Sequence, residues 1–247
     1  MILEKKNRKE GAVVLRKKPT SKKSVLFIVE GSSDKAALEK IFKTIYKNKN
    51  IVFKFTHGDI TSNDQITENE ICDEISKIVK NYMRQNKLRK SDIWQIVQIF
   101  DTDGTYIPET SIIYGETDSF EYSLTAIACK DPKKVLIRNQ KKKALMEYLN
   151  NISDIDGISY ITYYMSSNLD HALYDIQTLN PSLKQAYADE FYGFFDGREE
   201  LFIDFLESDV VNGVPNSYPG SWKYIKEQLH SLERHTNLHL YFQDHPY

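Results

Sequence analysis

Two carboxylates, Asp101 and Asp103, stand one residue apart at the end of an apolar run in the stretch QIVQIFDTDGTYIPE, residues 95–109. Three interpretations fit such a pair. The two acids ligate a metal ion for phosphodiester cleavage, or they serve as nucleophile and acid in phosphoryl transfer, or they lie in a solvated turn without chemistry. The choice depends on which other side chains the fold brings to the same place.

Acidic side chains also follow the other expected strands. They are Glu30 at the end of SVLFIVEG (24–31), Asp59 at the end of NIVFKFTHGDIT (50–61) and Asp170 after ISYITYYM (158–165). Ligands of open α/β sheets bind at the carboxyl ends of the strands, so we expect these acids to converge on one rim. Converging carboxylates repel one another unless cations neutralise them. Oxygen ligands without His or Cys favour Mg²⁺ or Mn²⁺ over zinc, so the residue types predict a magnesium or manganese site.

The elements that must position these acids alternate between strand and helix. The expected strands cover 24–31, 50–61, 92–100 and 158–165. The expected helices cover 32–48, a segment from Thr67 with Ile71, Ile75, Ile78 and Tyr82 inward, 138–151, 166–179 and a segment from Ser221. Ser32 or Ser33 is the expected N-cap of the first helix, and Thr67 with Glu70 forms a capping box for the second. This order predicts an α/β fold with a parallel sheet of about four strands flanked by helices.

Charge and composition divide the chain into three parts. Residues 1–23 contain nine Lys or Arg and two Glu, which indicates a basic flexible arm. Residues 24–180 form the expected sheet domain, with an insertion at about 105–157 that contains loop, short irregular pieces and a basic helix. Residues 181–247 form an expected helical C-terminal extension, whose aromatic segment 187–205 is either core or interface, so a homo-oligomer stays open.

Several of the acids also have a purely structural interpretation. Asp34 lies in a first helical turn, where a carboxylate interacts favourably with the helix dipole. Ser167 and Asp170 form an S-x-x-D pattern that equally fits a capping box. His57 and Asp59 fit an Asx-type turn. The residue types alone leave these alternatives open.

The fragment FDTDGT resembles the D-x-D-G-T signature of haloacid-dehalogenase-type phosphatases, in which the first Asp is the nucleophile. That family opens with this strand and carries a later acidic pair on a strand-end loop. Here about 95 residues precede the motif, already in β-α-β-α order, and no late G-D-x-x-x-D is present. The position of the motif in the chain therefore argues against the phosphatase.

The pattern VLFIVEGSSDK, followed by a β-α unit and then QIFDTDG, resembles the TOPRIM fold shared by topoisomerases, primases and the overcoming-lysogenization-defect (OLD) nucleases. The match covers residues 24–104 and 158–180. The resemblance implies a metal-ligand or general-base role for Glu30 and metal-ligand roles for Asp101 and Asp103. The E-x-x-x-D pair formed with Asp34 and the late S-x-x-D ending in Asp170 are similar to the OLD-type subgroup and imply a second metal site.

The resemblance also implies a function. The chain is similar to small stand-alone TOPRIM proteins of bacterial abortive-infection, or anti-phage, systems, which implies a toxic Mg²⁺- or Mn²⁺-dependent endonuclease acting on RNA, tRNA among its candidates, or on DNA. It implies a neighbouring AAA- or ABC-type ATPase as partner. Candidate contacts to the nucleic acid are Lys35, Ser167, Arg138, Lys141, Lys142 and Lys143. The rival interpretation is a non-catalytic TOPRIM-like interaction or sensor subunit that partners an ATPase.

The sequence excludes several other classes. It contains no run of about 18 apolar residues and no apolar core near its N-terminus, so we expect no membrane span and no secretory signal. Two cysteines, Cys72 and Cys129, are too few for a disulfide framework or a Cys-based zinc site, which favours a reduced cytoplasm. Without a G-x-x-x-x-G-K-[ST] stretch, we expect no ATP binding through a P-loop.

Overall fold

The computed structural model describes residues 23–246 apart from 48, 56–58, 64 and 209–212. Most of the predicted basic arm, residues 1–22, lies outside the described residues, as does His57. Among the helices in the described part of the chain, none has the length and apolar character needed to cross a membrane.

A five-stranded sheet forms the centre of the molecule, in the order β2-β1-β3-β8-β7. Its strands are β1 (Ser24–Val29), β2 (Asn50–Phe55), β3 (Ile93–Asp101), β7 (Asp154–Ile155) and β8 (Ile158–Met165). The first four strands in this order are parallel neighbours, and β7 is a short antiparallel edge. The predicted α/β fold with about four parallel strands is therefore confirmed. Because β1 and β3 pair directly, Glu30 and Asp101 leave adjacent strand ends.

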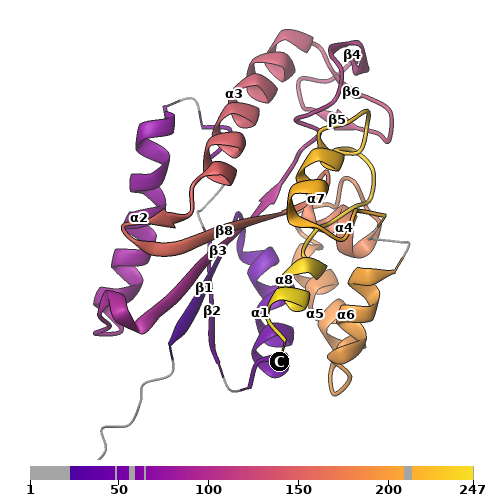
Figure 1. The fold of residues 1–247 in the computed structure, drawn as a ribbon. Coiled ribbons are helices and arrows are strands. Elements are labelled where there is room, and N and C mark those ends of the chain that lie inside the picture. Colours follow the sequence, from indigo (N-terminus) through magenta and orange to yellow (C-terminus); the bar gives the residue numbers. More distant parts are fainter. Residues whose placement is uncertain (1–22, 48, 56–58, 64, 209–212, 247) are drawn as a thin grey trace, which may run out of the picture.

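Helices cover both faces of this sheet (Figure 1). One layer contains α1 (Ser32–Ile45), α4 (Leu169–Tyr174), α5 (Lys184–Phe195), α6 (Glu200–Glu207) and α8 (His239–Asp244). The other contains α2 (Glu68–Gln85), α3 (Pro132–Asn151) and α7 (Tyr218–Ile225). Successive residues of β1 point to opposite faces, so Phe27 packs in the first layer and Ile28 in the second. Both layers are needed to bury this apolar strand.

Helix starts follow local capping, with some differences from prediction. The Glu70 carboxylate accepts the N–H of Thr67 at 2.9 Å, so the predicted capping box is confirmed. The N-cap of α1 is Gly31 rather than Ser32 or Ser33, because the Asp34 carboxylate accepts the Gly31 N–H at 2.8 Å. Three further differences are small: Val79 is buried in place of Ile78, Asn168 caps α4 in place of Ser167, and Ser217 caps α7, which begins at Tyr218 rather than Ser221.

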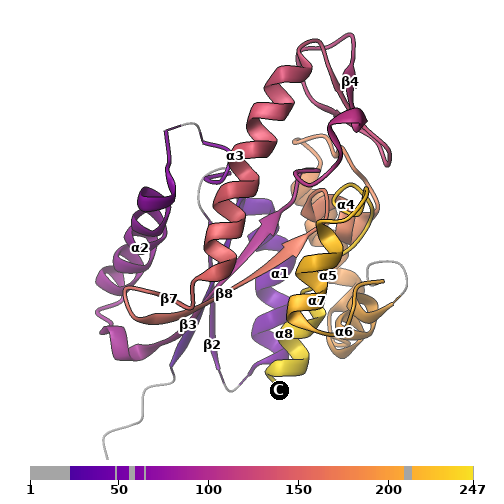
Figure 2. The ribbon, with the colours of Figure 1, turned by 45° about the horizontal axis from the view of Figure 1, so that its top comes forward.

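The segment between β3 and β8 is more ordered than its sequence indicates. A short 3₁₀ turn, η2 (Glu109–Ser111), leads into a second sheet of β4 (Ile112–Tyr114), β5 (Glu121–Tyr122) and β6 (Ile127–Cys129), in the order β4-β6-β5. From this small sheet α3 runs back to the central sheet (Figure 2). Leu145, Met146 and Leu149 of α3 are buried against α2 and the sheet, so α3 belongs to the helical layer of the central domain. The insertion into that domain is therefore limited to about residues 104–131.

The C-terminal segment packs into the domain instead of extending from it. Phe195 and Phe202 of the aromatic segment 187–205 are buried in the core, and Phe202 contacts Phe42 of α1 edge-on at 6.1 Å between ring centroids. The carbonyl of Ser231 accepts the N–H of Gly104 at 3.1 Å. This segment therefore forms part of the support for the loop that carries Asp103.

Candidate metal centre

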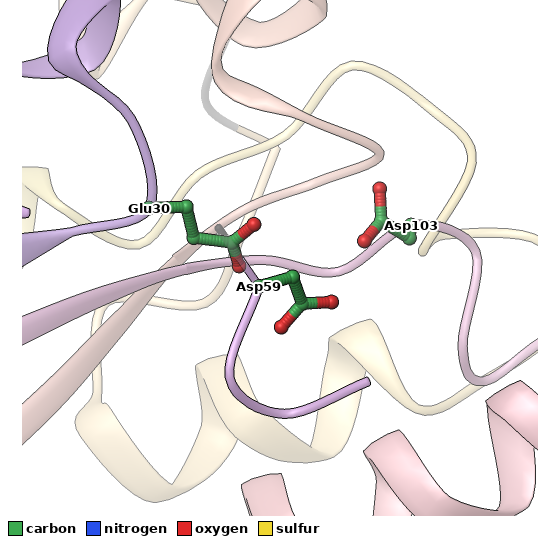
Figure 3. A group of neighbouring side chains, drawn as sticks. All are labelled: Glu30, Asp59 and Asp103. Atoms are coloured by element: carbon green, nitrogen blue, oxygen red, sulfur yellow. The ribbon is translucent and has the colours of Figure 1, made fainter. Parts of the chain in front are cut away.

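Three carboxylates from three separate segments meet at the carboxyl edge of the sheet. Glu30 follows β1, Asp59 follows β2 and Asp103 follows β3. One oxygen of each carboxylate lies within 4.8 Å of the others. Figure 3 shows the three side chains turned toward one another. Their side chains are 19%, 19% and 21% exposed, so the group is accessible from solvent but largely enclosed by protein.

A lysine from α3 lies among these three carboxylates. The Nζ atom of Lys142 is 2.6 Å from Asp59 Oδ2 and 3.7 Å from Glu30 Oε1, and it donates a hydrogen bond to Asp103 Oδ2. The Lys142 side chain is 0% exposed. A buried ammonium is costly unless it is paired and hydrogen-bonded, and here it has three acidic partners. Lys142 is thus the internal counter-ion of the carboxylate group.

The carboxylates of this group differ in their protonation equilibria. Burial raises the pKa of Glu30 well above its usual range, and the nearby Lys142 opposes this only in part. Burial also acts on Asp59, but Lys142 and the hydroxyls of Ser62 and Thr61 outweigh it and lower the pKa of Asp59 to about 2. Burial disfavours the charged form of Lys142, yet its acidic partners raise the pKa of this lysine well above its usual range. The ammonium and Asp59 therefore stay charged.

The backbone around Asp103 is held in an uncommon conformation. Asp103 has φ +48°, in the left-handed region that side chains other than Gly seldom adopt. Its N–H donates to the carbonyl of Ser167 at 2.6 Å, and its carbonyl accepts from Arg138 at 2.9 Å. Ser167 itself has φ +56°. Such conformations persist only where the surroundings fix them, and they cluster at functional sites.

Asp101 lies outside the first group and interacts electrostatically with Glu30 and Asp34. Its Oδ1 accepts the N–H of Leu169 at 2.9 Å, at the start of α4. Burial raises the pKa of Asp101 well above its usual range, and the charges of Glu30 and Asp34 add to this. Lys184 of α5 pairs with the 4%-exposed side chain of Asp170 at 2.8 Å. Lys184 thus forms an ion pair with Asp170 and interacts with Asp34 and Asp101 only electrostatically, at longer range, whereas Lys142 contacts all three acids of the first group.

The residues predicted to contact nucleic acid differ in their exposure and in their partners. Arg138 is only 12% exposed and binds the Asp103 carbonyl and the Tyr122 hydroxyl, so it positions the loop. Lys35 pairs with Glu39 within α1 at 3.6 Å. Lys141 is half-buried and Lys143 is exposed. Ser167 is buried, and its backbone rather than its hydroxyl supports the Asp103 loop.

Sequence reasoning placed Asp101 in the first group, where the structure has Asp59. Asp59 does form the predicted Asx-type turn, since its Oδ1 accepts the Thr61 N–H at 2.8 Å, and its second oxygen accepts from both the Ser62 hydroxyl and Lys142. The sequence indicates Lys142 only as one of several candidate contacts to phosphate, and not as the counter-ion of the carboxylates. No feature of the sequence indicates that Lys184 pairs with Asp170. The expectation that acids at the ends of neighbouring strands converge is correct for Glu30, Asp59 and Asp103.

The first group has the chemistry of a divalent-cation site. All three ligands are carboxylate oxygens, which Mg²⁺ and Mn²⁺ accept readily. Around octahedral Mg²⁺, adjacent oxygens lie about 2.9 Å apart and opposite oxygens about 4.2 Å apart, so three ligand oxygens that lie within 4.8 Å of one another draw closer by up to about 2 Å to bind the ion. The three carboxylates have the ligand chemistry of such an ion, and the fit requires this movement of their side chains. Comparisons of the chain with protein-family models, curated proteins and solved structures give no match.

Gly104, in the loop that carries Asp103, has a left-handed backbone conformation with φ +64°. A Cβ at this position would lie 2.6 Å from Leu232 Cδ2 and 2.9 Å from Ile127 Cδ1. Gly104→Ala is therefore expected to destabilise the protein by about 2–4 kcal/mol, from overpacking and the left-handed backbone. Urea unfolding measures this.

Gly193→Ala is the matched control, because nothing lies within 4 Å of the added Cβ in the last turn of α5. This control is expected to stabilise the protein by about 0.5–1 kcal/mol through helix propensity. Equal unfolding midpoints for Gly104→Ala and wild type would show that the Asp103 loop tolerates a side chain there.

Proposed function

We propose that this protein is a Mg²⁺- or Mn²⁺-dependent nuclease that cleaves phosphodiester bonds of RNA or DNA. The observation that carries the proposal is the convergence of Glu30, Asp59 and Asp103 within 4.8 Å at the carboxyl ends of parallel strands. This edge is where open α/β sheets bind ligands. The earlier resemblance of the E-G and D-x-D motifs to TOPRIM nucleases supports the same reaction.

In this proposal each residue has a defined role. Glu30, Asp59 and Asp103 would hold the ion, and the chemistry it would supply is positive charge for the phosphodiester and for a water molecule. Arg138 and the Ser167 carbonyl fix the Asp103 loop. From the resemblance we also propose Asp34, Asp101 and Asp170 as ligands for a second ion; their carboxylates interact electrostatically, but the spacing of a metal site is found among the described residues for Glu30, Asp59 and Asp103. Exposed Lys143 on α3 is a candidate contact to the phosphate backbone.

A cleavage assay tests the proposal. Purified full-length protein is incubated with tRNA, single-stranded RNA, single-stranded DNA and duplex DNA, with Mg²⁺, with Mn²⁺ or with EDTA. Cleavage of at least one substrate that stops in EDTA is the expected result. We further propose, from the resemblance alone, a cytoplasmic anti-phage role with an ATPase partner, so the assay is repeated with the product of any adjacent ATPase gene. Silence on all substrates in every condition contradicts the nuclease.

One observation favours a second candidate function, a non-catalytic interaction or sensor subunit. Lys142 already neutralises the three carboxylates in part, so the group does not need a metal ion to be stable. In this alternative Lys142 holds the three carboxylates together, and a partner protein binds the surface that they form. Divalent cations would then leave the melting temperature unchanged and no substrate would be cleaved, whereas the proposed nuclease requires the cations to bind.

A further inference from the structure

A cavity of about 250 Å³ lies between the loop that follows Asp103 and helix α3. Apolar side chains line it from both sides, Ile107 and Ile112 from the loop and small sheet and Leu136 from α3. Cavities for drug-sized ligands are roughly 300–1,000 Å³. This one is smaller, so it fits a single flat ring system better than a larger molecule.

The same cavity is lined by three residues with unsatisfied polar groups. Thr105, Asn139 and Tyr106 are 4%, 6% and 9% exposed, and each carries a side-chain oxygen that has no hydrogen-bond partner among the described residues. The Asn139 amide is oriented by its Nδ2, which donates to the Gly104 carbonyl at 3.2 Å and leaves Oδ1 as an acceptor. Buried polar groups in native structures are hydrogen-bonded as a rule. Each of these oxygens is itself covered by protein, so the side chain that carries it must turn slightly to present it to the cavity. Three such groups on residues that line one cavity favour a ligand with hydrogen-bonding edges.

The charge of the lining restricts the ligand further. Among the described residues that line the cavity, the charged ones are Glu109 and Lys143, and both are exposed at its rim. The buried lining offers hydroxyls, amides and apolar surface. A buried phosphate or carboxylate would lack a counter-ion there, so the enclosed part of the ligand is neutral. Apolar faces with neutral donors and acceptors at the edge describe a nucleobase.

The cavity also lies close to the carboxylate group. Thr105 is two residues beyond Asp103, and Asn139 precedes Lys142 by three positions on α3, a rise of about 4.5 Å along the helix axis. A nucleotide chain whose phosphate approaches Asp103 can therefore place an adjacent base against Asn139. Exposed Lys143 at the rim is positioned to meet the connecting backbone.

We propose that this cavity binds one unpaired nucleobase of the substrate strand, next to the bond that is cleaved. The proposal rests on the proposed nuclease function and deepens it, since it names the substrate as single-stranded, with base preference at one position. A base within a duplex has its hydrogen-bonding edge paired and its faces stacked, so it cannot enter without being extruded.

Binding of free nucleosides tests the cavity without requiring cleavage. Adenosine, guanosine, cytidine and uridine are titrated into the full-length protein in EDTA, and binding is followed by NMR. At least one nucleoside is expected to bind with a Kd of about 1 mM or tighter. Leu136→Trp fills the cavity and is expected to weaken this binding at least about 10-fold. Ile137→Trp, at a 61%-exposed neighbouring position outside the lining, is the matched control and should bind like wild type.

A second variant separates ligand binding from folding. Thr105→Val removes a hydroxyl that has no partner among the described residues, so its thermal midpoint should equal or exceed that of wild type. Its affinity for the preferred nucleoside should fall by about 2–10-fold. A lower midpoint with unchanged affinity would assign the hydroxyl to the fold and overturn its role in binding.

The two proposals fail in different ways. If no nucleoside binds wild type, or if Leu136→Trp binds as well as Ile137→Trp, the base site is overturned even where Mg²⁺-dependent cleavage is found. If nucleoside binding is found in wild type and lost in Leu136→Trp, the base site is supported. If no substrate is cleaved in the same experiments, the nuclease proposal is contradicted.

Discussion

A Glu30→Gln variant is expected to lose more than about 100-fold of its metal-dependent cleavage and to keep its fold. Gln keeps the size of the side chain but removes the charge that ligates the ion, and loss even of residues that only support metal ligands costs 10–100-fold. Glu30 is also central, because its Oε1 accepts the Asp101 N–H at 3.3 Å and lies 3.7 Å from Lys142. Initial rates at saturating Mg²⁺ measure the effect.

Glu190→Gln provides the matched control, since this exposed residue of α5 lies away from the carboxylate group. It should cleave at the wild-type rate. Asp101→Ala is expected to behave as Glu30→Gln if Asp34, Asp101 and Asp170 hold a second ion. Full activity of Glu30→Gln with metal present would rule out the proposed ligand set, whatever the outcome for Asp101.

The framework of the fold is predictable from sequence because its signals are local. The apolar run from Ser24 to Val29 is long enough only for a strand buried on both faces, and such strands belong to parallel sheets. The pair Thr67 and Glu70 specifies a helix start through contacts within four residues. Once the strand order is known, the place of Glu30 and Asp103 at one edge follows from backbone geometry.

The contents of the site depend on signals that are not local. Asp101 is the last residue of β3, whereas Asp59 lies four residues beyond β2, so only the conformation of the loop after β2 brings Asp59 to Glu30 and Asp103. Lys142 lies in the sequence RNQKKK, which is typical of a solvated helix face. The structure buries the middle of this basic run because Leu145 and Met146, one turn later, press α3 against the sheet. Helical spacing is the signal that distinguishes Lys142 from Lys143, because Lys142 lies on the same face of α3 as Val135, Leu145 and Leu149.

The contribution of the C-terminal segment to the site is equally unpredictable from the sequence. The Ser231 carbonyl accepts from both Gly104 and Ser167 across more than 60 residues of sequence, and Ser231 has an ordinary loop context. A carbonyl oxygen is present in every residue, so its use as an acceptor leaves no trace in the residue type. Contacts of this kind become visible only in coordinates.

A Lys142→Met variant is expected to be about 3–5 kcal/mol less stable than wild type in EDTA, because removing one partner of a buried ionic group leaves the others uncompensated. Met has a similar length and no charge, so the loss reports the ammonium. Urea unfolding in EDTA measures it. Lys143→Met, at the adjacent exposed position of the same helix, is the control and should change stability by less than about 0.5 kcal/mol.

Addition of Mg²⁺ to these two variants separates the two candidate functions. If the three carboxylates form a metal site, the ion replaces the missing ammonium and stabilises Lys142→Met more than wild type, in which Lys142 competes with it. The melting temperature of Lys142→Met should then rise steeply with Mg²⁺ concentration, and that of Lys143→Met should follow wild type. A variant that stays destabilised at every Mg²⁺ concentration would show that Lys142 is a permanent structural cation. The carboxylates would then exist to hold α3 on the sheet, and the acidic edge would have no place for an ion.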